Sequence, residues 1–293
     1  MIIVFGSINI DLLMSVSSLP APGETVLTHE MQRSPGGKGA NQAIASQRAG
    51  SKTKFVGCVG SDSDADEALS LLRYQEVDIS SVLFSDRSTG CAIVLVDNNG
   101  ENMITVASGA NLDIQADQVD GTELEDSSVL LLQQEVPLEQ NIKLATRAHQ
   151  TDTKVVYNFA PAGKLSEELF SVIDYLIVNE VEASTIMTPS IYDHPVEIAK
   201  TLCHEYGVTV VITLGSEGAL AVSKTTLAEV PAPSVKVVDT TGSGDTFCGY
   251  FAAEIAKGST SIESCLEVAI RAASVACTRY GAQSGIPHRH DVF

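Results

Sequence analysis

A glycine-rich turn that ends in an aspartate lies near the carboxyl end of the chain. Residues 239–250 read DTTGSGDTFCGY, and the apolar run from residue 245 has helical spacing. Gly242 and Gly244 permit backbone conformations that other residues rarely adopt, and they let a ligand approach closely. The first amides of a helix have no partner inside it and point outward as donors, which suits a phosphate. The segment therefore predicts an anion site at a helix start.

Asp245 admits two interpretations. A carboxylate at a helix start can simply cap the helix, while the glycines simply turn the chain. Alternatively, it could take the proton from an alcohol whose oxygen attacks the terminal phosphorus of ATP. The amides of Gly242, Ser243 and Gly244 would then stabilise the charge on the transferred group. Capping accounts less well for the whole Gly-Ser-Gly-Asp run, but the loop alone leaves both interpretations open.

Other nucleotide-binding motifs are missing from the sequence. There is no G-x-x-x-x-G-K-[ST] loop, no protein-kinase catalytic loop, and no G-x-G-x-x-G after a strand-like run. Residues 34–43, SPGGKGANQA, are rich in glycine but lack the spacing of a phosphate-binding loop. The sequence therefore disfavours a P-loop enzyme and a dinucleotide-dependent enzyme.

Short β-branched runs alternate with helical patterns along the chain. The runs are apolar almost throughout, as expected for strands that a parallel sheet buries on both faces. They are IIVF, TKFVGCV, SVLLLQ, KVVYNF, YLIVNE and VTVVITLG, and a strand-like VKVV precedes the glycine-rich turn. Helical spacing occupies 39–49, 64–76, 138–149, 195–206, 245–257 and 262–279. The alternation predicts one α/β domain over residues 1–293, a three-layer sandwich with a central, mostly parallel sheet.

Two segments interrupt this alternation. Residues 24–34 and 90–108 have the pattern of strands with no helix between them. The second contains Asn98, Asn99 and Gly100, a strong hairpin-turn signal. We therefore expect a small antiparallel β flap, formed from about 12–36 and 88–108, attached to the main sheet.

Polar residues gather just past the carboxyl ends of several predicted strands, where open α/β folds bind ligands. They are Asn9, Asp11, Glu135, Asn179, Glu182, Thr213, Gly215 and Gly218. Loops are polar in any protein, but this regularity favours a shared ligand cleft.

The composition argues against several kinds of partner. Lys and Arg total 18 while Asp and Glu total 37, so the formal net charge is −19. Such a surface repels nucleic acid and anionic membranes, although local amides and cations can still hold small phosphorylated ligands. The six cysteines form no C-x-x-C pair, and the amino terminus lacks a signal-peptide pattern. We therefore expect reduced thiols and a cytoplasmic location.

Several motifs, in order along the chain, resemble the ribokinase family of sugar kinases. They are GSINID at 6–11, PAPGETV at 20–26, GGKGANQA at 36–43, NEVE at 179–182, TLGSEG at 213–218, DTTGSGDTFCG at 239–249 and TRYGAQ at 278–283. GGKGAN and GSGDTF at this separation are specific to that family. The resemblance runs from residue 4 to about residue 287. It implies a ribokinase-like sandwich whose β flap is a lid, and a homodimer in which two lids pair.

The resemblance also implies roles for individual residues. Asp245 would be the catalytic base, beside an anion hole at Gly242, Ser243 and Gly244. The sugar would be held by Asn9, Asp11, Gly37, Lys38, Gly39, Asn41, Glu135 and Asp245. The ATP side would comprise Asn179, Thr213, Gly215, Ser216, Gly218 and Gly244. Glu182 would organise Mg²⁺ through water, and K⁺ would lie by Asp239, Thr241, Ala276, Arg279, Gly281 and Gly285.

The implied reaction is ATP-dependent phosphorylation of D-ribose at O5. Another sugar or a nucleoside, such as deoxyribose, fructose or adenosine, stays open as the substrate, and so does a non-catalytic sensor on the same scaffold. The chain departs from the family pattern at two positions. Gly285 stands where many relatives offer a serine hydroxyl to the cation, and Phe159 stands where relatives often have proline.

Overall fold

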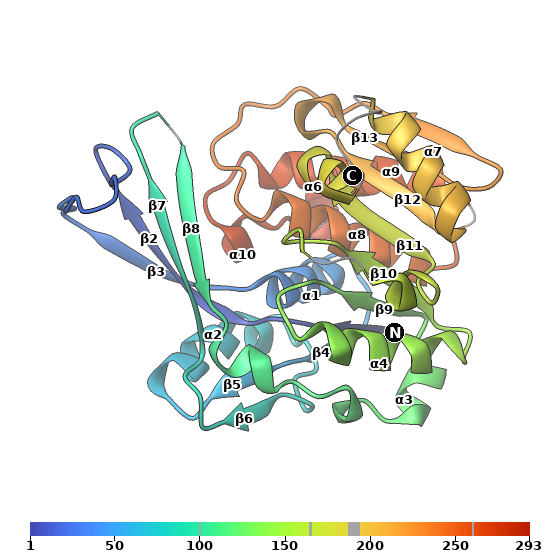
Figure 1. Cartoon of the computed structure of the whole chain (residues 1–293), viewed down its shortest axis with the longest axis horizontal. Coiled ribbons are helices and arrows are strands. Elements are labelled where there is room, and N and C mark those ends of the chain that lie inside the picture. The colour runs from blue at the N-terminus through green and yellow to red at the C-terminus, as the bar shows by residue number, and fades with distance from the viewer. Residues whose placement is uncertain (100, 164–165, 187–193, 260) are drawn as a thin grey trace.

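The centre of the molecule is an eight-stranded sheet (Figure 1). A computed structural model describes residues 1–99, 101–163, 166–186, 194–259 and 261–293. The strands of the central sheet are β1 (Ile2–Phe5), β4 (Thr53–Val56), β9 (Val129–Leu132), β10 (Lys154–Asn158), β11 (Tyr175–Asn179), β12 (Thr209–Thr213), β13 (Ala219–Val222) and β14 (Leu227–Val230). Their spatial order is β14-β13-β12-β11-β10-β9-β1-β4. Neighbours from β4 to β12 pair in parallel, and β13 and β14 add an antiparallel edge.

Helices cover both faces of this sheet. One face packs against α1 (Lys38–Arg48), α2 (Ser63–Tyr74), α8 (Ser243–Ala256) and α9 (Ile262–Ala276). The other face packs against α3 (Gly121–Glu125), α4 (Leu138–His149), α5 (Glu167–Phe170), α6 (Glu180–Ile186) and α7 (Pro195–Tyr206). In β1, Ile2 and Val4 belong to the first core while Ile3 and Phe5 belong to the second. Successive side chains of a strand point to opposite faces, so this apolar run separates two cores, and the predicted three-layer sandwich is confirmed.

A second, four-stranded sheet extends to one side of the molecule (Figure 1, left). Its strands are β2 (Asn9–Ser15), β3 (Met31–Gly36), β7 (Gly90–Val96) and β8 (Asn102–Ala107). The outer pairs β2–β3 and β7–β8 are antiparallel, whereas the inner pair β2–β7 is parallel. Gly100 of the expected hairpin turn lies outside the described residues. β5 (Cys58–Gly60) and β6 (Leu83–Ser85) form a separate two-stranded sheet.

Two strand predictions were wrong. Residues 24–30 of the expected strand at 24–34 are irregular, because a turn at Ala21–Glu24 and the Thr28 hydroxyl, which donates to the Ser15 carbonyl at 2.7 Å, shape this segment. The run VKVV at 235–238 forms no strand. The side chains of Val235 and Val237 line a cleft instead.

Several helix boundaries and short elements also differ from the prediction. The helix expected from residue 245 already begins at Ser243, and the one expected at 262–279 ends at Ala276. The antiparallel edge strands β13 and β14 were not anticipated. Short helices α10 (Ala282–Gly285) and α11 (Arg289–Val292) end the chain. Among the helices in the described parts of the chain, none has the length and apolar character needed to cross a membrane.

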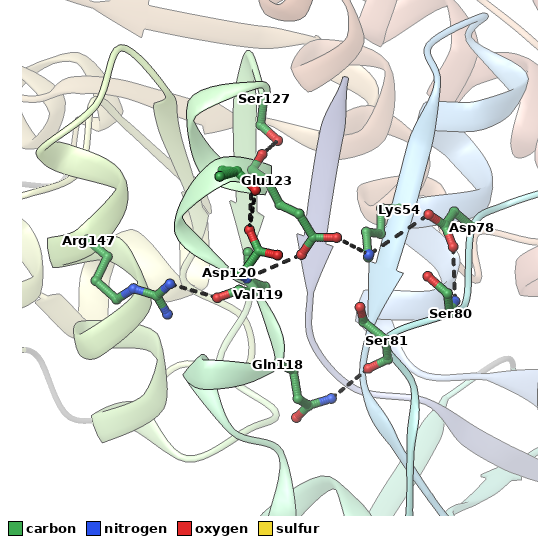
Figure 2. A network of polar contacts seen from close by, with 11 residues as sticks. Lys54, Asp78, Ser80, Ser81, Gln118, Val119, Asp120, Glu123, Ser127 and Arg147 are labelled. Atoms are coloured by element: carbon green, nitrogen blue, oxygen red, sulfur yellow. Dashed lines mark hydrogen bonds and ion pairs between the residues drawn. The ribbon is translucent and has the colours of Figure 1, made fainter.

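A buried ion pair links the strand at one edge of the central sheet to α3. Figure 2 shows Lys54 of β4 between the carboxylates of Glu123 and Asp78. Lys54 is 5% exposed, and its ammonium lies 3.9 Å from Asp78 and closer to Glu123. Nearby, the Gln118 amide donates to the Ser81 carbonyl at 2.7 Å. These contacts tie residues 118–123 to the edge of the sheet.

Candidate active site

The glycine-rich turn is the start of α8. Gly242 is the N-cap in a left-handed conformation with φ 73°, and a Cβ there would lie 2.9 Å from the Cα of Ala282. Glycine is therefore required at position 242. At Gly244, by contrast, no atom of the described residues lies within 4 Å of the position that a Cβ would occupy, apart from the chain neighbours and the backbone of α8 itself. The helix start is thus closely packed on one side and open on the other.

Two side chains of α1 form hydrogen bonds to the Asp245 carboxylate. It is 8% exposed. The amide of Asn41 donates to Asp245 Oδ2 at 2.8 Å, and the amide of Gln42 donates to Asp245 Oδ1 at 2.9 Å. Both oxygens thus bind side chains of another helix. This arrangement favours the chemical interpretation of Asp245 over capping.

Two adjoining clefts open beside this helix start. The larger is about 480 Å³, and its apolar wall includes Phe247, Ile270 and the two valines at 235 and 237. The smaller is about 140 Å³. Thr213 and Gly244 line both clefts, so the two adjoin at the helix start. A ligand that occupied both would have one end against the apolar wall and the other beside the helix-start amides.

The residues expected on the ATP side lie at these clefts. Thr213, Gly215, Ser216, Gly218, Ser243 and Gly244 line the larger cleft. Asn179, Glu182, Gly242, Lys38 and Asp245 line the smaller one. The smaller cleft is thus where the expected ATP and sugar residues meet.

The residues expected to hold the sugar lie where β2, β3 and α1 meet. Glu135, past the end of β9, accepts from the Ser7 hydroxyl at 2.5 Å and from the Lys38 amide at 3.2 Å. Asn9 Oδ1 accepts from the Asn111 amide at 2.8 Å. These contacts fix two of the polar side chains in place. The Asp11 carboxyl lies against Gly36, where a Cβ would come within 2.1 Å of Asp11 Oδ2.

The glycines of GGKG bring the start of α1 close to residues 6–8, the segment between β1 and β2. Gly37 has φ 89°, and a Cβ there would lie 2.7 Å from the Ile8 Cα. A Cβ at Gly39 would lie 2.6 Å from the Gly6 carbonyl carbon. Only glycine permits this approach. It brings Lys38 to the smaller cleft that Asp245 also lines.

Burial and neighbouring charges alter two ionisation equilibria in this region. Burial raises the pKa of Asp11 to about 7, and the carboxylates of Glu135 and Asp245 add to the rise. Burial acts to lower the pKa of the Lys38 ammonium. The carboxylates of Asp245 and Glu135 outweigh that effect, so this pKa is raised. Lys38 therefore stays charged, while Asp11 titrates near neutral pH.

Glu182 is tied to Asn179 in a reciprocal pair. The backbone amide of Asn179 donates to Glu182 Oε2 at 2.9 Å, and the backbone amide of Glu182 donates to Asn179 Oδ1 at 2.7 Å. Burial raises the pKa of Glu182. Within the described ranges, no group of three or more His, Cys, Asp or Glu side chains could hold a metal. A divalent cation here would take most of its ligands from phosphate and water, which suits Mg²⁺.

The residues expected at the monovalent-cation site are neighbours. Asp239 accepts from the Thr241 amide at 2.9 Å, from the Thr241 hydroxyl at 2.6 Å and from the Gly281 amide at 2.8 Å. A Cβ at Gly285 would lie 3.6 Å from the Ala276 carbonyl oxygen. The Ala276 carbonyl accepts from the Arg279 amide at 3.0 Å, the Gly281 carbonyl accepts from the Gly285 amide at 3.0 Å, and position 285 adds no hydroxyl. The Arg279 side chain pairs with Asp291 instead.

Sequence reasoning missed several polar residues behind these clefts. They are Ser7, Gln42, Asn111, Gln133 and Asn158, all buried. Gln42 directly follows Asn41 in GGKGANQA, and Ser7 lies within GSINID, so their places in these motifs were the available signals. Gln133 and Asn158 lie at or just past the ends of apolar strands, and Asn111 lies in a 3₁₀ turn at 109–113. Nothing in the pattern there distinguishes a network residue from an ordinary loop residue.

The comparisons with known proteins agree with this geometry. The sequence matches the pfkB family of carbohydrate kinases over residues 1–289. It is 37% identical to the ribokinase of Haemophilus influenzae, over 98% of this chain and 95% of that protein. It is also 37% identical to the ribokinase of Bacillus subtilis, over 99% of this chain and 97% of that protein.

Solved structures extend the match to three dimensions. The ribokinase of Thermotoga maritima superposes with a TM-score of 0.90 at 37% identity, covering 99% of this chain and 97% of that one. The ribokinase of Arabidopsis thaliana, complexed with ribose and ATP, gives a TM-score of 0.89 at 31% identity, covering 99% and 96%. The predicted ribokinase-like fold is confirmed. The chain belongs to the pfkB family of carbohydrate kinases.

Proposed function

We propose that this protein transfers the terminal phosphoryl group of ATP to O5 of D-ribose. The observation that carries the proposal is the position of Asp245. It lines the smaller cleft together with the ATP-side residues, and its charge acts on the expected sugar residue Asp11. Relatives named as ribokinases support ribose as the sugar, among them a structure complexed with ribose and ATP.

The reaction needs one proton acceptor and one anion site. Asp245 takes the proton of the O5 hydroxyl as that oxygen forms a bond to the terminal phosphorus. The bond from that phosphorus to the bridging oxygen of ATP breaks, and ADP leaves. The amides at Gly242, Ser243 and Gly244 stabilise the negative charge on the transferred group. The products are ribose 5-phosphate, ADP and a proton.

Sugar recognition rests on acceptors that match hydroxyl donors. Ionised Asp11 and Glu135 can only accept, whereas Asn41 can donate and accept. Asn41 Oδ1 is buried without a partner within the described residues, so it is ready to receive a hydroxyl. A sugar that lacks the matching hydroxyl would leave such a group unpaired, which lowers its affinity.

Two cations complete the proposal. Mg²⁺ would accompany ATP and neutralise phosphate charge, with Glu182 ordering its water ligands. K⁺ would lie by the carbonyls near Asp239, Ala276 and Gly281. Because Gly285 supplies no hydroxyl, we expect weaker K⁺ dependence than a serine at this position would give.

We also infer a cytoplasmic homodimer. All six cysteines are free, as is usual in a reducing compartment. Apolar side chains of the four-stranded sheet face solvent, namely Met31, Ile93, Met103, Ile104 and Val106. The strand register puts Ile104 and Val106 on one face of this sheet and Met31, Ile93 and Met103 on the other. Pairing of two such sheets through one face would bury one of these two sets.

A coupled assay of ADP release over a panel of sugars and nucleosides, with and without K⁺, tests the proposal. We expect D-ribose to give the highest kcat/KM. A higher value for deoxyribose, fructose or adenosine would assign a different substrate to the same chemistry. Tight sugar binding without ADP release would show a sensor rather than a kinase.

A further inference from the structure

A chain of buried carboxamides stands behind the proposed base. The Gln42 amide nitrogen donates to Asp245 Oδ1 at 2.9 Å and to Asn158 Oδ1 at 3.0 Å. The Gln133 amide nitrogen donates to Gln42 Oε1 at 2.8 Å. Gln42 and Gln133 are 0% exposed, and Asn158 is 7% exposed. Hydrogen bonds in such a dry environment are strong and expensive to leave unmade.

The direction of each amide in this chain is fixed by its neighbours. A neutral carboxamide donates through nitrogen and accepts through oxygen. The Asn158 nitrogen donates to the Ile177 carbonyl at 3.2 Å, so its oxygen faces Gln42. The Gln42 side-chain oxygen accepts a hydrogen bond from the Gln133 side-chain nitrogen. Turning the Gln42 amide over would set its oxygen against the Asp245 carboxylate, so only N–H is presented to the base.

We propose that Gln42 is a positioning residue for Asp245, and that Gln133 acts through Gln42. Asn41 donates to one carboxylate oxygen and Gln42 to the other, so the plane of the carboxylate is fixed from both sides. This inference rests on the proposed function, in which Asp245 accepts the sugar proton. Misplacing a reacting group by about 1 Å costs on the order of 100-fold in rate, so the orientation contributes to kcat.

Methionine substitutions test the chain, because methionine is close to glutamine in length but has no N–H. Gln42→Met should lower kcat on the order of 10-fold to 100-fold. The sugar Kd, measured by calorimetry without nucleotide, should change by less than about threefold, because Asn41, Asp11 and Glu135 keep their contacts. Gln133→Met should also lower kcat, but by a smaller factor than Gln42→Met does.

The variant that combines Gln42→Met and Gln133→Met gives the most discriminating test. If Gln133 acts only through Gln42, the double variant should have the kcat of Gln42→Met, within about twofold. Two unconnected packing effects would multiply instead, and that result would overturn the proposal. If Gln42→Met does not fold, the result for Gln133→Met decides. An unchanged kcat in Gln133→Met would overturn the proposal, whereas a lowered kcat with an unchanged sugar Kd would support it.

Ser46→Ala is the matched control. The Ser46 hydroxyl is buried between the same two helices. It donates to the backbone carbonyl of Gln42 at 2.8 Å and lies 3.3 Å from the Gly249 carbonyl of α8, but it makes no hydrogen bond to the Gln42 side chain or to Asp245 among the described residues. The kcat of Ser46→Ala should stay within about twofold of wild type. A fall in kcat as large as that of Gln42→Met would indicate a general packing effect rather than positioning of Asp245. No turnover with any sugar would overturn the proposed function and this inference together. Turnover that depends on Asp245 but not on Gln42 would overturn this inference alone.

Discussion

The carboxylates of Glu135 and Asp245 act both on Asp11 and on the ammonium group of Lys38. With three carboxyl groups and one cation in partly buried surroundings, full ionisation leaves repulsion uncompensated. Asp11 carries the consequence, since burial first and its acidic neighbours second raise its pKa to about 7. A sugar whose hydroxyls donate to the oxygens of these carboxylates would relieve the repulsion between them.

Asp11→Asn should therefore alter the pH dependence of stability. The pKa of Asp11 is higher in the folded protein than its ordinary value of 3.8, so its stabilising contribution is present at low pH. That contribution is lost as pH rises through about 7. Relative to wild type, the free energy of unfolding of Asp11→Asn should rise between about pH 4 and pH 8. Urea titrations across this range measure the difference, and a constant difference would contradict the assignment.

At the scale of elements, the start of α8 combines a closely packed glycine with an open one. Gly242 has φ 73° and abuts Ala282, so it shapes the turn. Gly244 has open space beside it and lines both clefts. One glycine thus supports the fold and the other leaves room for ligand.

Gly244→Ala should separate activity from stability. Beyond its chain neighbours and the backbone of α8, the methyl group meets no atom of the described residues within 4 Å, so the melting temperature should stay the same or rise slightly. The same methyl enters the clefts, so KM for ATP should rise and kcat fall, together on the order of 10-fold or more in kcat/KM. Gly242→Ala is the contrasting control, expected to lose about 1–3 kcal/mol of stability to strain. Unchanged kinetics in Gly244→Ala would refute phosphate binding at this helix start.

The link between β4 and α3 concerns stability alone. Lys54 is 5% exposed in the wild-type protein, and Glu123→Ala would leave its ammonium with Asp78, at 3.9 Å, as its ion-pair partner among the described residues. Breaking such a pair should destabilise by about 2–3 kcal/mol, whereas Lys54→Met, which removes the buried charge itself, should cost less than half as much. Urea unfolding of both variants checks the order. Equal losses would mean that packing, not charge, dominates this contact.

At the scale of the whole molecule, the four-stranded sheet presents apolar side chains on a chain whose net charge is −19. Self-repulsion of that size opposes non-specific association. A dimer must therefore depend on a specific apolar contact, and Ile104, 56% exposed on β8, is a candidate for it.

Ile104→Glu should convert a homodimer into a monomer in sedimentation velocity runs. A carboxylate would have to be buried in the sheet-to-sheet contact, which is strongly unfavourable. Leu227→Glu, at a residue 49% exposed on β14, should leave the assembly unchanged. A wild-type protein that sediments as a monomer would end the dimer proposal.

The sequence predicted the layers of the fold and grouped several residues that line the clefts, for physical reasons. Apolar runs such as IIVF must be buried on both faces, and the carboxyl ends of parallel strands share one edge, so Glu135, Asn179 and Thr213 could be grouped in advance. The carboxamide chain could not be foreseen, because its contacts join residues 91 and 203 positions apart. The run VKVV failed as a strand because local propensity cannot tell a sheet from the wall of a cleft.

The most direct test of the account is the turnover of Asp245→Asn, measured as ADP release at saturating ATP and ribose, beside its ribose Kd from calorimetry. Asparagine keeps the shape of the side chain but cannot accept the hydroxyl proton. The account predicts that kcat falls on the order of 10²-fold to 10⁴-fold while the ribose Kd stays within about threefold of wild type. Turnover near the wild-type value would contradict the role of Asp245 as the base.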